Sequence, residues 1–588
     1  MPSRPGTSRP KSHPVARLLA AAVGLVLTAP VAAQEVAPEA ASPGLANHEG
    51  PTTATRHMVA AANPYATAAG LGILRAGGSA VDAAIAAQLV LNLVEPQSSG
   101  IGGGAFLLHY AGQDGALSAY DGRETAPAAA TPALFLTPDG APMGFWEAVV
   151  GGRSVGVPGL LRLLEMAHQD HGRLAWATLF KPAIRLARDG FAVSPRLHAL
   201  VSGDQHLKSN PAAAAYFHDA DGTAKPIGTL LRNPDLAETL EAIAAGGASA
   251  FYEGPIAADI VAAVTGAADN PGALSLADLG GYHAVKRDVL CAPYRAWQVC
   301  GMPPPTSGGV AVLQTLGILA HFDLAAAGSR SAGGIHLVAE ASRLAFADRN
   351  HYLADADFVD VPVKRLLEPD YLAERAALIS PMQSLGTATP GLEDRKAAAP
   401  AQIEPPATTH LSVVDQWGNA VSMTSSIENA FGTRLMVRGF LLNNQLTDFS
   451  FRPEVDGEPV ANRVEPGKRP RSSMSPTLVL DQDGRLVMAI GSPGGSRIIG
   501  YVVKTLVGVL DWGMDIQAAI SLPHFVNRNG PTDLEAETTL TGLAEPLSAL
   551  GHEVRESVMT SGLHGIWIGP DGLQGGADPR REGVARGD

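Results

Sequence analysis

The strongest candidate for chemistry in this chain is a threonine that opens a strand-like run. In PPATTHLSVVDQWGN (405–419), Thr408 and Thr409 directly follow a proline-rich segment. A threonine hydroxyl is a poor nucleophile until a base takes its proton, and the free α-amine of an N-terminal threonine is such a base. An internal threonine lacks that amine, so Thr408 can act only if the chain is cut between Ala407 and Thr408. The alternative is an ordinary strand position, where threonine is common.

A glycine pair offers a second part of the same chemistry. Gly494 and Gly495 lie in GSPGGSRIIGYVV, between a strand-like run and a helical periodicity that starts near Ser496. Free backbone N–H groups gather at such a junction. Such groups can bind an anion. The alternative is that the two glycines only cap the helix.

Other stretches that resemble known sites lack the context that those sites need. GIGGGA (100–105) follows a helical pattern and leads into a strand, the reverse of the order in a dinucleotide site. DADG (219–222) begins like a calcium loop, but its twelfth position is Leu230 and not Glu. No His or Cys spacing indicates zinc, and no nucleophile elbow is present. We therefore expect neither a metal nor another cofactor.

Composition favours a globular protein that acts on small molecules. The chain has 588 residues, of which 46% are hydrophobic, so it can bury a large core. Its formal net charge of −14 argues against a nucleic-acid partner, because phosphate binding needs clustered Lys and Arg.

Residues 1–33 have the organisation of an export signal. Basic residues precede the short apolar stretch LLAAAVGLVLTAP, and Val31 and Ala33 are small residues where a signal peptidase reads them. We expect cleavage before Gln34 and a periplasmic or secreted protein without membrane contact after that cleavage. An uncleaved anchor is the alternative, although the apolar stretch is shorter than a bilayer span.

The elements that must position these residues follow from periodicity and turn signals. Helices are expected at 63–96, interrupted by Gly77–Gly78, over most of 150–290, and at 310–322 and 333–350. Strands are expected at 100–110 and 115–127, where Arg123 looks exposed, and antiparallel hairpins at 409–427 and 477–490. Thr387–Pro406 is expected to be a surface loop.

The two cysteines lie in CAPYRAWQVC (291–300), which predicts two short strands joined by a turn. In an oxidising compartment Cys291 and Cys300 could pair and close a small loop. The alternative is two buried free thiols.

From about residue 50 to its end, the sequence resembles the γ-glutamyltranspeptidases, which are N-terminal nucleophile hydrolases. The blocks that carry this resemblance are GGSAVDAAIAAQLVLNLVEPQSSGIGGGAFLL, DGRETAPAAAT, GMPPPTSGG, TTHLSVVD, LLNNQLTDFS, KRPRSSMSPT, GSPGGSRI and GGADPRR. The resemblance implies an α+β fold, an αββα four-layer sandwich with antiparallel sheets. It also implies self-cleavage into a large fragment, 34–407, and a small fragment, 408–588, which stay associated.

By position, the resemblance assigns a role to each residue of a glutamyl site. Thr408 would be the nucleophile, Ser426 would orient it where a threonine is usual, and Gly494 and Gly495 would bind the oxyanion. The substrate's α-carboxylate would be held by an arginine and two hydroxyls, from Arg123, Ser472 and Ser473. The α-ammonium would face Glu428, which stands where Asn is usual, together with Gln445 and Asp448. His410 is expected to be a packing or hydrogen-bonding residue.

The resemblance implies cleavage of γ-glutamyl amides such as glutathione, with transfer of the glutamyl group to water or an amino acid. A glutaryl or cephalosporin acylase of the same fold is one alternative, but two carboxyl groups facing an uncharged methylene would be poorly compensated. A periplasmic binding protein that is never processed is another. The segment 449–471 contains no tyrosine, which predicts a more open pocket.

Overall fold

The computed structural model describes residues 1–3, 6, 50–392 and 407–588. By its internal contacts the chain divides into Met1–Glu35 and Val36–Asp588, and the second unit carries the fold. Apart from residues 1–3 and 6, the expected export signal lies outside the described residues, as does the expected surface loop beyond residue 392. Within the described ranges, no helix has the length and apolar character needed to cross a membrane.

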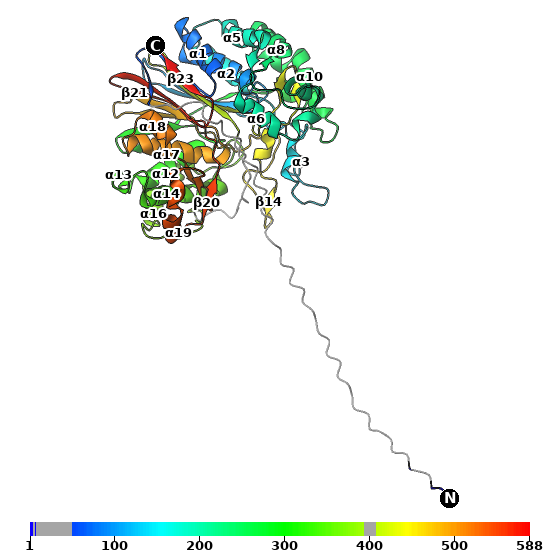
Figure 1. Cartoon of the computed structure of the whole chain (residues 1–588), viewed down its shortest axis with the longest axis vertical. Coiled ribbons are helices and arrows are strands. Elements are labelled where there is room, and N and C mark those ends of the chain that lie inside the picture. The colour runs from blue at the N-terminus through cyan, green and yellow to red at the C-terminus, as the bar shows by residue number, and fades with distance from the viewer. Residues whose placement is uncertain (4–5, 7–49, 393–406) are drawn as a thin grey trace. The chain divides into compact units, whose positions relative to one another are not determined.

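Two antiparallel sheets form the centre of the fold (Figure 1). In the described residues each has seven strands. The first runs in the order β1 (Thr52–Ala54), β22 (Gly572–Ala577), β21 (His564–Gly569), β17 (Leu486–Gly491), β16 (Thr477–Leu480), β9 (Trp297–Gly301) and β8 (Leu290–Tyr294). The second runs in the order β23 (Val584–Gly587), β2 (Met58–Ala61), β10 (Thr409–Val414), β11 (Ala420–Ser426), β3 (Gly104–Tyr110), β4 (Leu117–Gly122) and β7 (Val285–Arg287).

Alternation along the strands explains why the sheets stack. In β3, Ala105 and Leu107 pack into the helical layer, whereas Phe106 and Leu108 face the other sheet. Both faces of the second sheet are thus apolar, so each must be covered. Hydrogen bonds also join the sheets, for example from Ser422 Oγ to the carbonyl oxygen of Ile490 at 3.0 Å.

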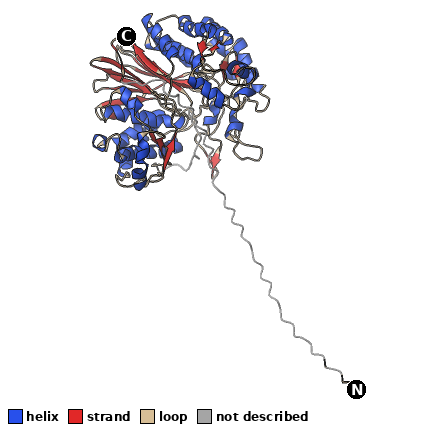
Figure 2. Cartoon of the chain, viewed as in Figure 1, coloured by secondary structure: helices blue, strands red, loops and turns tan. Residues whose placement is uncertain are grey.

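Helices cover the outer face of each sheet, which completes the αββα sandwich (Figure 2). The second sheet packs against α1 (Pro64–Arg75), α2 (Ala80–Val94) and α4 (Leu160–His171), with α5 (Trp176–Asp189), α8 (Pro234–Gly246) and α10 (Gly254–Thr265) in the same apolar cluster. The first sheet packs against α12 (Gly308–Leu319), α17 (Ile498–Leu510) and α18 (Ile516–Ser521), backed by α14 (Ala332–Tyr352) and α16 (Pro369–Ala377). The predicted α+β class and its four layers are confirmed.

Most of the predicted elements are also confirmed. The helices α1 and α2 flank the glycine pair at 77–78, and Ser79 begins α2 with a capping box to Asp82. GIGGGA connects α2 to β3, and DADG forms a turn outside the named helices and strands. The prediction that Arg123 is exposed is wrong. Its side chain is 1% exposed, because the chain after β4 runs beneath the segment 448–471 instead of over the surface.

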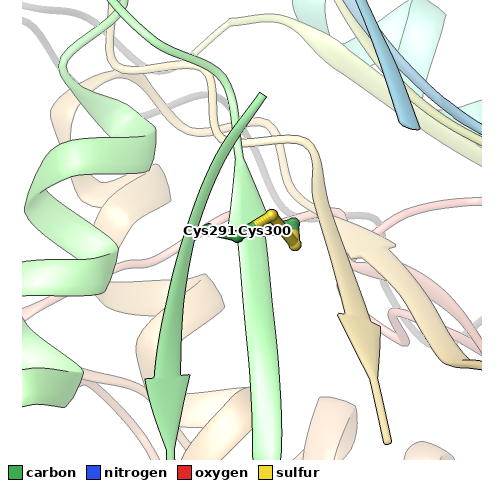
Figure 3. The surroundings of a disulfide bond; sticks show 2 residues. All are labelled: Cys291 and Cys300. Atoms are coloured by element: carbon green, nitrogen blue, oxygen red, sulfur yellow. A yellow bond between two sulfur atoms is a disulfide. The ribbon is translucent and has the colours of Figure 1, made fainter. Parts of the chain in front are cut away.

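The two cysteines occupy opposite positions on β8 and β9. Cys291 and Cys300 are register partners in this antiparallel pair, and a disulfide joins them (Figure 3). The strand pair and its turn confirm the sequence prediction, and the structure decides between the disulfide and two free thiols. The disulfide links the strands from which the chain runs into α12.

Candidate active site

Thr408 lies buried at the start of β10, beside the end of the neighbouring strand. Its Oγ1 is 3.0 Å from Ser426 Oγ, and the Ser426 oxygen also accepts a hydrogen bond from the backbone N–H of Glu428 at 2.9 Å. The pairing of β10 with β11, in which Thr409 faces Ser425, brings the two hydroxyls together. Thr408 has a φ of 93°, a conformation in which a β-branched residue is strained.

The peptide bond before Thr408 meets the glycine pair. The N–H of Gly494 donates a hydrogen bond to the carbonyl oxygen of Ala407 at 3.2 Å. Gly494 has a φ of 135° and Gly495 a φ of 57°, so both occupy backbone conformations that glycine reaches without steric cost. The turn between β17 and α17 thus directs a backbone donor at the carbonyl that Thr408 would have to attack.

A pocket of about 290 Å³ opens beside the Thr408 hydroxyl. Nine of the ten residues that the resemblance assigned to the site line it; the tenth, Gly494, is hydrogen-bonded to Ala407, the residue before Thr408. The lining residues are Arg123, Thr408, Ser426, Glu428, Gln445, Asp448, Ser472, Ser473, Met474, Gly495 and Ile498. The sequence reasoning did not name Met474 and Ile498, which are apolar positions in otherwise recognised motifs.

Opposite charges meet in this pocket. The Arg123 guanidinium contacts Asp448 Oδ2 at 2.5 Å, and Gln445 Nε2 donates to the same oxygen at 2.7 Å. Backbone carbonyls also hold the arginine, since its Nε donates to the oxygen of Pro470 at 3.1 Å. The pocket therefore presents a fixed cation beside a carboxylate, which matches a ligand that carries both charges on one carbon.

A second carboxyl group, that of Glu428, is fully buried next to the first. Burial raises the pKa of Glu428 well above its usual value, and the nearby Asp448 charge raises it further. Asn444 Nδ2 donates a hydrogen bond to its Oε2. Because Asp448 has Arg123 as a partner, Glu428 is the carboxyl of this pair whose ionised form is disfavoured by burial and by the neighbouring charge.

The serine pair 472–473 is tied to residues far away in the sequence. Ser473 Oγ accepts a hydrogen bond from Arg349 Nη2 at 2.6 Å, and Ser307 Oγ donates to the carbonyl oxygen of Ser472 at 2.6 Å. Arg349 Nε also donates to Ser307 Oγ at 2.9 Å. Sequence reasoning missed Arg349, because it lies inside a helical run with no local sign of its distant partner.

His410 is hydrogen-bonded to neighbouring side-chain hydroxyls. His410 is fully buried beside Thr424 and Ser412 hydroxyls, and burial lowers its pKa well below the usual value.

Elsewhere, the side-chain ligand atoms of His336, Glu340 and His552 lie within 4.8 Å of one another. Hydrogen bonds account for this cluster: His336 Nε2 donates to the carbonyl of Ser380, its Nδ1 pairs with His552, and Glu340 binds the Arg343 guanidinium. It does not line the pocket.

An acidic and a basic residue behind Thr408 also escaped the sequence analysis. Arg581 Nη1 donates to the carbonyl oxygen of Thr408 at 2.9 Å, and Thr409 Oγ1 donates to Glu95 Oε2 at 2.8 Å. Glu95 and Arg581 approach each other to 3.4 Å. Both residues lie in blocks that carried the resemblance, GGSAVDAAIAAQLVLNLVEPQSSGIGGGAFLL and GGADPRR, but only the fold shows that they meet.

Comparison with known proteins agrees with this geometry. Residues 66–587 match the family described as gamma-glutamyltranspeptidase. The glutathione hydrolase proenzyme of Bacillus subtilis (strain 168) is 38% identical over 544 residues, which cover 90% of this chain and 91% of that protein. The same-named protein of Escherichia coli (strain K12) is 38% identical over 543 residues, with 90% and 91% covered. The crystal structure of cephalosporin acylase from Bacillus halodurans superposes with a TM-score of 0.79 at 27% identity, covering 92% of this chain and 98% of that one. The chain thus belongs to the γ-glutamyltranspeptidase family.

Proposed function

We propose that this chain is a self-processing γ-glutamyltransferase and hydrolase that cleaves γ-glutamyl amides such as glutathione through an ester on Thr408. The observation that carries the proposal is the contact between the Gly494 N–H and the carbonyl oxygen of Ala407, directly beside the Thr408 hydroxyl. This contact supports the proposal because an attacking oxygen, a carbonyl and an oxyanion donor would then lie in one site.

Self-cleavage follows from that arrangement. The Thr408 oxygen attacks the carbonyl carbon of Ala407, and the Gly494 N–H stabilises the resulting oxyanion. The C–N bond then breaks, and the Ala407 acyl group rests on the Thr408 oxygen while the nitrogen of Thr408 gains a proton. Water hydrolyses this ester, which leaves a carboxylate on Ala407 and a free α-amine on Thr408. The backbone strain at φ 93°, of order 1–3 kcal/mol, favours the step because cutting the chain releases it.

The same groups then act on a substrate. The α-amine of Thr408 takes the hydroxyl proton, the oxygen bonds to the γ-carbonyl carbon, and Gly494 and Gly495 hold the oxyanion. The amide C–N bond breaks and the amine returns the proton to the leaving nitrogen. Water or the amine of an amino acid then attacks the ester carbon and gives a proton to the α-amine. The bond from this carbon to the Thr408 oxygen breaks, the α-amine passes the proton to that oxygen, and glutamate or a new γ-glutamyl amide leaves.

Charge matching in the pocket supports a glutamyl substrate. Arg123 is placed to bind the α-carboxylate, with hydroxyl donors from Ser472 and Ser473, and Asp448 with Gln445 to bind the α-ammonium. Ser426 orients the nucleophile, and Glu428 adds an acceptor beside the ammonium. Acceptors are water or amino acids, and no cofactor takes part in these steps.

The proposal includes a location and a fragment boundary. The export signal, 1–33, would be removed, and the mature protein would consist of 34–407 and 408–588 in the periplasm or outside the cell. The organisation of the first residues supports export, and the contacts at Ala407 and Thr408 support the cut.

The first test is the mass of the purified protein under denaturing conditions, for wild type beside Thr408→Ala and Thr408→Ser. Wild type should give two fragments that meet between Ala407 and Thr408, the serine variant should give the same fragments more slowly, and the alanine variant should stay whole. A wild-type chain that stays whole would overturn the enzyme proposal in favour of a binding protein.

An acylase of the same fold is the second candidate, favoured by the structural similarity to the cephalosporin acylase of Bacillus halodurans. Turnover of γ-glutamyl-p-nitroanilide and of glutaryl-p-nitroanilide distinguishes the two, since only the first carries an α-ammonium. We expect the glutamyl compound to be the better substrate; a preference for the glutaryl compound would assign the chain to the acylases.

A further inference from the structure

Next to the proposed nucleophile, and outside the residues that line the pocket, lies a buried ion pair that the mechanism above does not use. Arg581 is 0% exposed, and its Nη1 contacts both the carbonyl oxygen of Thr408 at 2.9 Å and Glu95 Oε1 at 3.4 Å. Its Nε donates to the carbonyl oxygen of Ser561 at 2.9 Å. The guanidinium is therefore held in one orientation, with one N–H directed at the residue that would carry out the reaction.

The acidic partner holds the next residue of the chain. Glu95 follows the last residue of α2, and its Oε2 accepts the hydrogen bond from Thr409 Oγ1 at 2.8 Å. Glu95 would belong to the large fragment and Arg581 to the small one. The pair thus holds Thr408 and Thr409 from two sides, across the two fragments that the cut would create.

We propose that Arg581, balanced by Glu95, is a positioning residue that orients Thr408 and keeps its α-amine in the neutral form that a base requires. The inference rests on the proposed function, because the amine exists only after the cut.

The physical reason is the distance between the guanidinium and that amine. The nitrogen and the carbonyl oxygen of one residue are separated by three bonds, so the Arg581 cation lies within about 6 Å of the Thr408 nitrogen. A free α-amine has a pKa near 7.7–8.0 and would be largely protonated at neutral pH. A fixed cation at that distance disfavours a second positive charge and lowers the pKa of the amine, while a carboxylate raises it.

Other charged groups lie near Thr408 and also affect the charge of its α-amine. His410 is kept neutral by burial and adds no charge. In the part of the chain that the structure describes, the nearby charged groups include the pocket residues Arg123, Asp448 and Glu428, and Arg196 and Glu582 beyond the pair. Arg123 is paired with Asp448, and Arg581 is the cation whose Nη1 contacts the carbonyl oxygen of Thr408.

The test is the pH dependence of kcat/KM for γ-glutamyl-p-nitroanilide, whose acidic limb reports the ionisation of the free enzyme's base. It uses the processed, full-length protein and the variants Arg581→Gln, Arg581→Lys, Glu95→Gln and the double variant Arg581→Gln/Glu95→Gln. Arg586→Gln, an exposed arginine in the same C-terminal segment, is the matched control.

The expected shifts have opposite signs. Arg581→Gln should move the acidic limb up by roughly 1 pH unit, and Glu95→Gln should move it down, because one removes a cation and the other an anion. In the double variant the acidic limb should lie close to its wild-type pH. Arg581→Lys should leave the acidic limb at its wild-type pH while lowering kcat. Arg586→Gln should change neither quantity.

A purely structural role predicts a different result, namely lower kcat/KM at every pH with an unmoved limb, and that result would overturn the inference. If Arg581→Gln is not processed, the sign of the Glu95→Gln shift decides: an unmoved or raised limb contradicts the proposal. Failure of the proposed function would instead appear as a wild-type protein that is uncut or inactive.

Discussion

At the scale of single residues, the pocket is built around charge pairs that a γ-glutamyl head group can complement. Arg123 and Asp448 meet at 2.5 Å, and the substrate's α-carboxylate and α-ammonium are the counterparts of these two groups. An ion pair that is held by backbone carbonyls and an amide costs little reorganisation when such a zwitterion binds.

Asp448→Asn should weaken recognition of the α-ammonium. Losing one charged partner of a buried contact costs about 2–4 kcal/mol, so kcat/KM for γ-glutamyl-p-nitroanilide should fall roughly 30- to 1000-fold. Turnover of the glutaryl amide should fall much less, since that compound has no ammonium. Steady-state kinetics on both substrates measure this, with the 71% exposed Asp483→Asn as control. Equal losses of kcat/KM on both substrates would show that Asp448 does not bind the α-ammonium.

Glu428→Gln should stabilise the protein in a pH-dependent way. The pKa of Glu428 in the folded state is raised above 4.5, so the fold favours the protonated carboxyl and wild type loses stability relative to the glutamine variant as pH rises above that value. Calorimetry should show a variant midpoint about 1–3 °C higher at pH 8 and unchanged at pH 4. The exposed Glu553→Gln is the control. A gain of equal size at both pH values would mean that folding does not raise the pKa of the Glu428 carboxyl.

At the scale of elements, two connections place the reacting groups. The turn from β17 into α17 presents the Gly494 N–H, and the β10–β11 pair presents the two hydroxyls. The strand pair β8–β9 leads through 302–307 to the serines of the pocket, so its disulfide lies upstream of a site-forming segment.

Gly494→Ala should block both the cut and the turnover. At a φ of 135° a side chain is strained, and its Cβ would lie 2.6 Å from the ring of Tyr501. Displacement of this donor should lower the rates of processing and turnover by about 100- to 1000-fold. Fragment formation over time and kcat measure the effect. Gly542→Ala, where no atom lies within 4 Å of the new Cβ, should behave as wild type. Normal processing of Gly494→Ala would show that the turn accommodates the side chain without moving the N–H, and would contradict the prediction.

Replacing the two cysteines should destabilise the protein but leave its chemistry intact. The disulfide closes a loop with a sequence separation of 9, worth about 2–3 kcal/mol in the chain-entropy model. Cys291→Ala/Cys300→Ala should therefore lower the thermal midpoint by a few degrees and leave kcat within about twofold. Wild type treated with a reductant isolates the effect of the covalent link from that of the lost side chains. An unchanged midpoint in both samples would contradict the prediction.

At the scale of the whole molecule, the proposed fragments are interleaved in both sheets. In the second sheet the order runs from β23 of the small fragment to β2 of the large one, then to β10 and β11 of the small and β3 of the large. In the first sheet, small-fragment strands lie between β1 and β9 of the large fragment. Separation would break sheet hydrogen bonds and expose a shared core, so the cut should leave one folded particle.

Deleting residues 584–588 should weaken the association of the two proposed fragments. The deletion removes β23 from the sheet edge beside β2, and with it the ion pair between Arg75 and Asp588 at 2.6 Å. We expect a thermal midpoint lower by several degrees and, by native mass spectrometry, partial release of fragments. Asp588→Ala should have a much smaller effect, because the ion pair with Arg75 is exposed and screened by water. Equal effects of both changes would locate the stabilisation in the ion pair rather than the strand.

The sequence by itself determined the local elements and the candidates for chemistry. Strand-like runs around turn residues predicted the hairpins that became β10–β11 and β16–β17, and helical periodicity broken by Gly77–Gly78 predicted α1 and α2. The threonine after the proline-rich segment and the glycine pair before a helix were recognisable because their chemistry depends on neighbours within a few residues. The family resemblance supplied the substrate-binding residues by position.

Only the tertiary structure decided which distant groups meet. Arg123 lies 347 residues from the carbonyl of Pro470 that it binds, and Arg581 lies 173 residues from Thr408. Such contacts depend on how the two sheets and their helical layers pack, and periodicity and turn chemistry carry no information over that separation. For the same reason the burial of Arg123, the contact of Gly494 with Ala407 and the ion pair behind the nucleophile emerged only from the fold.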